Sequence, residues 1–156
     1  MHPEIVAHYG NKLRVRACGL CIRNDALLMV NHTLGHDVDF WAPPGGGIEF
    51  METARDTIVR EFREETGYEV EVGKVLFICE FRKAPLHAIE LYFKVRIVGG
   101  KLSGGADPET KHPVIREVRF MTADDLSGLP IESLHGLFAK SRIPADLMSL
   151  TGYLEI

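Results

Sequence analysis

Three glutamates near the middle of the chain have the spacing of a metal site. Glu61, Glu64 and Glu65 stand at positions i, i+3 and i+4, so on a helix they share one side. Without a cation this arrangement is unfavourable, because each like-charge pair costs roughly 0.2–0.5 kcal/mol. Ligands that offer only oxygen favour Mg²⁺ or Mn²⁺ over zinc. The trio is therefore a candidate Mg²⁺ site in which Mn²⁺ can substitute.

A solvated charged helix is the competing interpretation, because arginines lie among these glutamates and could neutralise them. Counting 100° per residue places Glu61 and Glu65 beside an apolar stripe rather than opposite it. That stripe consists of Ala54, Ile58 and Phe62. Taken alone, the acidic cluster favours the solvated helix. The surrounding residues are therefore needed to distinguish a metal site from a charged surface.

The sequence marks both ends of the helix that would carry the glutamates. Thr53 suits the N-cap, and Asp56 follows three residues later as in a variant capping box. Gly67 stands where a helix C-terminus favours left-handed backbone. These signals predict a helix over residues 53 to 66.

The segment from Gly46 to Tyr68 resembles the Nudix box, the motif of a hydrolase family. The box reads glycine, five residues, glutamate, seven residues, then R-E-U-x-E-E-x-G-U, where U is usually bulky and aliphatic. All seven fixed positions match: Gly46, Glu52, Arg60, Glu61, Glu64, Glu65 and Gly67. The aromatic Phe62 and Tyr68 depart at two flexible positions. The preceding W-A-P-P-G-G is similar to the family's W-x-L-P-G-G, with Pro43 in place of leucine.

The resemblance implies a fold of the α/β class, namely an α/β/α sandwich in which the box forms a loop–helix–loop against a mixed β-sheet. It also implies a Mg²⁺-dependent pyrophosphohydrolase. The substrate would be a nucleoside diphosphate linked to another moiety, with water attacking a phosphorus. A second hypothesis keeps the fold as a non-catalytic nucleotide-binding sensor, and a third is a plain α/β scaffold with an acidic helix.

The resemblance also implies roles for the box residues. Glu61, Glu64 and Glu65 would hold the metals, and the Gly46 carbonyl would add a ligand. Either Glu61 or Glu64 would orient or deprotonate the attacking water. The glycines on either side of Gly46 would let the backbone approach metal or phosphate closely.

Supporting roles follow for residues inside and outside the box. Arg60 would hold a box glutamate by a charge-assisted hydrogen bond, and Glu52 would brace the loop. A further carboxylate from outside the box often joins such a site. Glu117 is the first candidate and Glu109 the next, although an exposed strand-end or loop glutamate is an equally good interpretation of each.

Substrate contacts are less well marked. Arg14, Arg16 and Arg82 could contact phosphates, and Trp41 could stack on a base, although solvent-facing arginines and a core tryptophan are the simpler interpretations. ADP-ribose cleavers of the family carry a proline about fifteen residues past the box glycine, where this chain has Arg82. The sequence therefore does not choose among nucleoside triphosphates, nucleotide sugars and related diphosphates.

The remaining pattern predicts one mixed α/β domain over residues 1–156. Predicted strands cover residues 13–22, 26–30, 40–42, 70–81, 88–98 and 114–121, with a hairpin turn at 23–25. Short helices are predicted from residue 123 and over 132–140, and loops at 32–39, 99–100 and 103–113.

The amino-acid composition limits the protein class, the expected partner and the expected location. A hydrophobic content of 46% is ordinary for a globular protein, and no apolar run is long enough to span a membrane. A net charge of −4 argues against a broad nucleic-acid surface, so a nucleotide-type small molecule is the expected partner. The N-terminus shows no secretory signal pattern, and the expected location is cytoplasmic. The sequence leaves a homodimer open.

Cys18-Gly19-Leu20-Cys21 has the C-x-x-C pattern found in redox and zinc sites. In a strand, residues i and i+3 face opposite sides of the sheet, and no second C-x-x-C or histidine pair accompanies it. Two small core residues are therefore expected rather than a redox or zinc site.

Overall fold

The described part of the chain, residues 3–33, 38–103 and 115–156 of this computed structural model, contains nine strands, four α-helices and two 3₁₀ helices. The strands are β1 Lys12–Leu20, β2 Ile22–Arg23, β3 Ala26–Thr33, β4 Asp39–Ala42, β5 Gly45–Gly47, β6 Tyr68–Lys83, β7 Leu86–Gly100, β8 Ile115–Met121 and β9 Gly152–Glu155. The helices are α1 Pro3–Tyr9, α2 Ala54–Thr66, α3 Ala123–Ser127 and α4 Pro144–Met148, with 3₁₀ helices η1 Ile131–Ser133 and η2 Gly136–Ala139.

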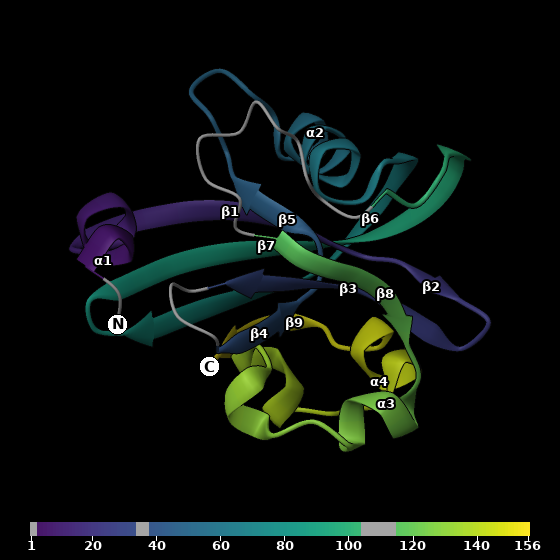
Figure 1. The fold of residues 1–156 in the computed structure, drawn as a ribbon. Helices are drawn as coiled ribbons and strands as arrows, with labels where there is room; N and C mark the ends of the chain where they lie inside the picture. Colours follow the sequence, from purple (N-terminus) through teal and green to yellow (C-terminus); the bar gives the residue numbers. More distant parts are fainter. Residues whose placement is uncertain (1–2, 34–37, 104–114) are drawn as a thin grey trace.

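The strands form two sheets that lie between α2 and the C-terminal helices (Figure 1). One sheet has the order β5-β1-β7-β6-β9, and the other has β2-β3-β4 with β8 also paired to β3. The five-stranded sheet is mixed, because β1 runs parallel to β7 whereas β6 and β7 are antiparallel. These layers confirm the predicted α/β/α arrangement with a mixed sheet.

The glycine strand β5 lies at the edge of the five-stranded sheet. It pairs antiparallel with β1, and the partners are Arg16 with Gly47, Ala17 with Gly46, and Cys18 with Gly45. This strand was not predicted, because glycine disfavours strands and its ladder partners lie far away in the sequence. The pairing brings the first box glycine beside the middle of β1.

Two apolar clusters hold the layers together. Under α2, Ile58 and Phe62 are fully buried and pack with Ala17. Gly19 permits this packing, because a Cβ there would lie 2.6 Å from the Phe62 ring. The second cluster joins both sheets to the C-terminal segment; its members include Cys18, Trp41, Phe77, Tyr92, Leu137 and Phe138.

The structure confirms the hairpin turn and the interpretation of the C-x-x-C string. Asn24 and Asp25 have φ values of 52° and 60° between the antiparallel strands β2 and β3. Cys18 and Cys21 are free, buried and placed in different clusters, as expected for small core residues on opposite faces.

Two predicted elements were wrong. The helix expected over 132–140 is broken into η1 and η2 by Leu134, whose backbone is extended and bridges Trp41. Gly99 and Gly100 were expected in a loop but end β7, where they pair with β6 and Gly100 takes the left-handed φ of 72° that suits glycine. Both differences result from contacts with residues distant in the sequence, which the local sequence pattern does not reveal.

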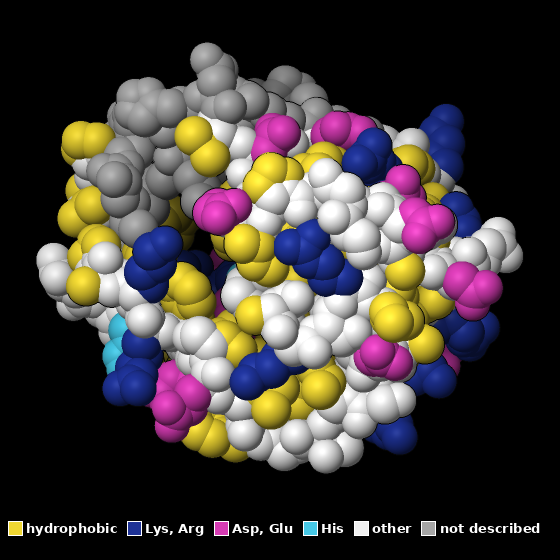
Figure 2. Space-filling model, turned by 90° about the horizontal axis from the view of Figure 1, so that it is seen from below, with side chains coloured by type: hydrophobic (Ala, Val, Ile, Leu, Met, Phe, Trp, Pro, Cys, Tyr) yellow, Lys and Arg dark blue, Asp and Glu magenta, His cyan; other side chains and the backbone are white. Residues whose placement is uncertain are grey.

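One face of the molecule carries a mixture of basic and acidic side chains. On the face shown in Figure 2, Lys and Arg side chains alternate with Asp and Glu rather than forming one basic field. Among the described residues, no helix has the length and hydropathy of a membrane span.

Candidate active site

Helix α2 has the ends that the sequence predicted. Thr53 is the N-cap, and its side-chain oxygen accepts a hydrogen bond from the Asp56 N–H at 3.1 Å. Gly67 closes the helix with a φ of 78°, and its N–H donates to the Arg63 carbonyl. The helix therefore ends just after the acidic trio, which occupies its last two turns.

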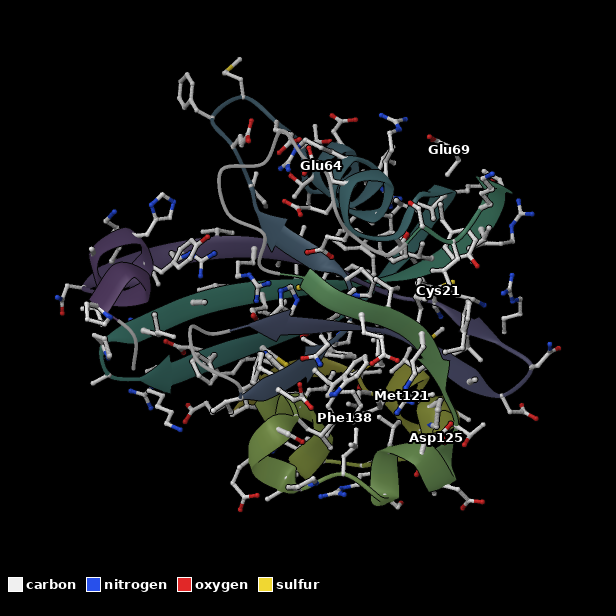
Figure 3. All side chains as sticks on the ribbon, viewed as in Figure 1. Cys21, Glu64, Glu69, Met121, Asp125 and Phe138 are labelled. Atoms are coloured by element: carbon white, nitrogen blue, oxygen red, sulfur yellow. The ribbon has the colours of Figure 1, made fainter. Side chains whose placement is uncertain are left out.

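The three box glutamates differ in burial although they share one side of α2. Glu65 is only 6% exposed, whereas the side chain of Glu61 is 15% exposed and that of Glu64 is 45% exposed. In Figure 3, Glu64 lies on the α2 side of the strands, opposite the layer that contains Phe138. The trio thus runs from the core to solvent.

The glycine strand closes against the two inner glutamates. The Gly45 N–H donates to Glu65 Oε2 at 3.1 Å. A Cβ on Gly46 would lie 2.1 Å from Glu61 Oε1, and one on Gly45 would lie 2.4 Å from the Ala17 carbonyl oxygen. Close approach to the backbone of β1 therefore requires glycine at Gly45, whereas a side chain at Gly46 would displace the Glu61 carboxylate.

Arg60 organises the outer end of the site. Its Nε and Nη2 donate to the two carboxylate oxygens of Glu52 at 2.8 and 3.0 Å, a bidentate pair. Its Nη1 donates to Glu61 Oε1 at 2.7 Å and to Glu64 Oε2 at 3.4 Å. Nη2 also reaches the Gly47 carbonyl at 3.3 Å, so one guanidinium links the loop to the helix.

The glutamates at the two ends of the site have opposite electrostatics. Hydrogen bonds from Arg60 and Thr57 lower the pKa of Glu52 to about 2. Burial and the charge of Glu61 raise the pKa of Glu65 well above its usual value. Burial also raises the pKa of Glu61, although Arg60 works in the opposite direction. Negative charge is therefore compensated at Glu52, partly compensated at Glu61 by Arg60, and least compensated at Glu65.

This donor set fits a cation that brings part of its own coordination shell. In the described residues, no three His, Cys, Asp or Glu side chains are gathered closely enough to enclose a metal ion. Mg²⁺ commonly keeps several waters and takes only a few carboxylates plus substrate phosphate. Two adjacent carboxylates of raised pKa beside the Gly46 backbone suit such an open site.

A buried ionic cluster lies on the other side of the glycine strand. Arg16 Nη1 donates to Glu90 Oε1, and its Nη2 donates to the Gly45 carbonyl at 3.4 Å. Glu90 Oε2 lies 2.9 Å from His135 Nε2 and accepts a hydrogen bond from the Tyr92 hydroxyl at 3.3 Å. Only Arg16 was singled out from the sequence, as a candidate phosphate contact.

One sequence signal could have identified Glu90. On β7 it shares one face with Ala88 and Tyr92, both of which are buried, so the two-residue period of a strand predicts a buried acid at position 90. Its partners Arg16 and His135 lie 74 and 45 residues away in the chain, and no local spacing reveals them.

The other candidate substrate contacts are scattered. Trp41 is 3% exposed and packs in the core, which leaves little ring surface for a base. Arg14 lies over the Tyr9 ring at 4.3 Å. Arg82 is exposed and lies 3.7 Å from Glu155. The structure does not bring these three side chains into one described pocket, and their substrate contacts stay predictions.

The two glutamates proposed as a further metal ligand, Glu117 and Glu109, stay predictions. Glu117 lies on β8, where it alternates with Val118, a member of the cluster under α2. Its side chain therefore leaves the opposite face of β8, and it lies 3.9 Å from Arg119. Glu109 lies outside the described residues.

Comparison with known proteins establishes the family. A family model described as the NUDIX domain matches residues 12–140, so the chain belongs to this family, and the predicted family is confirmed. Among solved structures, a MutT NUDIX hydrolase from Burkholderia pseudomallei aligns with a TM-score of 0.68 and 19% identity, over 87% of this chain and 98% of that one. A UDP-X diphosphatase gives 0.65 and 18%, over 99% and 75%. At these identities the likeness concerns the fold.

Relatives in sequence include two kinds of hydrolase. An ADP-ribose pyrophosphatase of Methanocaldococcus jannaschii is 29% identical over 114 residues, which is 72% of this chain and 62% of that protein. Diphosphoinositol polyphosphate phosphohydrolase 3-alpha of Homo sapiens is 35% identical over 80 residues, 49% and 48% of the two chains. The chain thus spans less than two thirds of the length of these relatives.

Proposed function

We propose that this protein is a pyrophosphohydrolase that uses Mg²⁺ to cleave a nucleoside diphosphate linked to another moiety. The observation that carries the proposal is the inner pair, Glu61 and Glu65, which lies against Gly45 and Gly46 and for which Arg60 supplies a cationic partner to Glu61 alone among the described contacts. Membership of the NUDIX family and relatives named as pyrophosphatases support it.

Each box residue has a part in this reaction. Glu61, Glu64 and Glu65 hold the cation, which when bound polarises a phosphoryl oxygen and lowers the pKa of a bound water. Arg60, fixed by Glu52, keeps the Glu61 carboxylate turned toward Gly46. The glycine backbone leaves room for the substrate diphosphate next to that carboxylate.

Glu64 is the better placed of the two candidate bases. Its side chain is 45% exposed, and its hydrogen bond with Arg60 is long at 3.4 Å. The carboxylate can therefore turn toward a water without breaking a short hydrogen bond. Glu61 is held by Arg60 at 2.7 Å. A base has to reach the proton that it removes, which favours the less constrained carboxylate.

The proposal specifies the pyrophosphate linkage that is cleaved, and a panel of compounds has to identify the moiety attached to it. Relatives named for ADP-ribose make that compound the first to test, although Arg82 occupies the place where ADP-ribose cleavers of the family carry proline. Nucleoside triphosphates, nucleotide sugars and a diphosphoinositol polyphosphate complete the panel.

The test incubates purified protein with this panel, with and without Mg²⁺, and identifies products by mass spectrometry. We expect Mg²⁺-dependent products of pyrophosphate cleavage from at least one nucleotide, and their loss in Glu64→Gln. Glu71→Gln is the matched control, because Glu71 is exposed, lies outside the box and pairs with Arg96 at 2.8 Å. Tight nucleotide binding without cleavage across the panel would favour the sensor hypothesis instead.

A further inference from the structure

The ionic cluster of Arg16, Glu90 and His135 is unusual for its depth. Glu90 is 1% exposed and His135 is 3% exposed, and both lie between the sheets rather than at the surface. Burying charged groups costs free energy that well-packed apolar side chains would avoid. A role beyond stability would account for such an arrangement in this fold.

The backbone fixes the proton on His135. The Leu137 N–H donates to His135 Nδ1 at 3.1 Å, so Nδ1 carries a lone pair. The neutral ring then has its hydrogen on Nε2, which donates to Glu90 Oε2 at 2.9 Å. His135 can therefore serve Glu90 as a neutral donor, while Arg16 balances the charge of Glu90.

The same cluster reaches the active site through one residue, Gly45. Arg16 Nη2 donates to the Gly45 carbonyl at 3.4 Å, and the Gly45 N–H donates to Glu65 Oε2 at 3.1 Å. These contacts, joined covalently through the Cα of Gly45, connect η2 with α2, elements on opposite sides of the strands. Figure 3 shows these two layers through the labelled residues Phe138 and Glu64.

We propose that Glu90 and His135 are positioning residues for the metal site, acting through Arg16 on Gly45 and so on Glu65. Arg16 fixes the carbonyl of the peptide that joins Gly45 to Gly46, and the N–H of Gly45 fixes the Glu65 carboxylate. Partners that orient metal ligands commonly change metal affinity about 10- to 100-fold when lost. The inference rests on the proposed function, because it presupposes a cation at the box glutamates.

Two substitutions at one position separate positioning from stability. His135→Gln keeps an amide donor near the place of Nε2, whereas the amide of the shorter His135→Asn lies near the place of Nδ1, where it can accept from the Leu137 N–H but is too short to donate to Glu90. Both replacements are neutral and polar, so they perturb the core similarly. Leu147→Ala supplies a destabilised control, because the side chain of Leu147 in α4 is apolar and fully buried.

The measurement is Mn²⁺ binding to the metal-free protein, with free Mn²⁺ read from its electron paramagnetic resonance signal. We expect His135→Asn to weaken Mn²⁺ binding by about tenfold or more. His135→Gln and Leu147→Ala should stay within about threefold of wild type, a bound set below the effect of losing a partner that orients a ligand. Denaturant unfolding of each variant checks that the fold is retained.

The outcomes separate the two proposals. Wild-type protein that binds Mn²⁺ and cleaves a nucleotide while His135→Asn binds Mn²⁺ equally well overturns the positioning role alone. A loss in Leu147→Ala as large as in His135→Asn overturns it too, because general loosening would then suffice. Wild-type protein that neither binds Mn²⁺ nor cleaves any compound of the panel overturns the proposed function, and the positioning role with it.

Discussion

The two ends of the Nudix box use carboxylates in opposite ways. At the outer end, Glu52 meets the guanidinium of Arg60 in a bidentate pair, and its pKa falls to about 2. At the inner end, Glu65 is buried beside Glu61, and its pKa rises. At the outer end the Arg60 guanidinium neutralises Glu52, and the pair holds the loop in place. At the inner end no side-chain cation contacts Glu65 in the described residues, so a metal ion can bind there.

The strongest test of this contrast neutralises the inner end. Glu65→Gln should lower kcat by at least about 100-fold, because losing a metal ligand removes several kcal/mol of transition-state stabilisation. The metal-free protein should keep its free energy of unfolding, since the amide oxygen can still accept from the Gly45 N–H and the repulsion from Glu61 is gone. Steady-state kinetics and urea unfolding measure the two effects.

Glu71→Gln is the control for this comparison, as an exposed glutamate on β6 outside the box. Turnover in Glu65→Gln within a few-fold of that in Glu71→Gln would show that the inner end holds no essential cation.

The glycines give a second test. A methyl group on Gly46 would displace the flexible Glu61 carboxylate, so Gly46→Ala should lower kcat by about 10- to 100-fold with little loss of stability. Gly47→Ala should be near wild type, because a Cβ on Gly47 would meet no atom within 4 Å. Kinetics of the two variants side by side check this, and equal losses in both would contradict the close contact at Gly46.

The brace can be loosened while its charge is kept. Arg60→Lys keeps one positive charge but loses the fork that grips Glu52 and Glu61, so kcat should fall by about tenfold. Arg63→Lys is the matched control, because Arg63 makes a similar bidentate pair with Glu69 at the exposed side of the same helix. If both variants lose activity equally, the fork at Arg60 has no special part.

The smallest expected effect is a pH dependence of stability. The pKa of Glu52 is lowered in the folded protein, so its stabilisation is present above about pH 4.5 and is lost as the pH falls toward 2. We expect Glu52→Gln to be less stable than wild type by about 1 kcal/mol at pH 7, and the gap to shrink toward pH 3. Urea unfolding at several pH values measures the gap, and one that stays constant would contradict the brace.

Sequence was enough for the local parts of this site. The N-cap at Thr53, the C-cap at Gly67 and the burial of Ile58 and Phe62 follow from signals within one helix, and each is found as predicted. The greater burial of Glu61 and Glu65 than of Glu64 also follows from helical periodicity.

The parts that sequence could not supply depend on pairing between distant segments. The strand formed by residues Gly45–Gly47 exists because β1 pairs with it, and the partners of Glu90 come from β1 and from the C-terminal segment. Leu134 is extended because it bridges Trp41, which interrupts the helix that its neighbours would favour. In each case a contact across the fold overrides or adds to the local preference.

The most direct test of the account is diffraction from crystals of the protein soaked in Mn²⁺, with data collected at the manganese absorption edge. If a cation binds at the box glutamates, we expect an anomalous peak at coordination distance, roughly 2 Å, from carboxylate oxygens of Glu61 and Glu65 and beside the Gly46 carbonyl. A peak bound elsewhere, or none at these carboxylates at millimolar Mn²⁺, would contradict it.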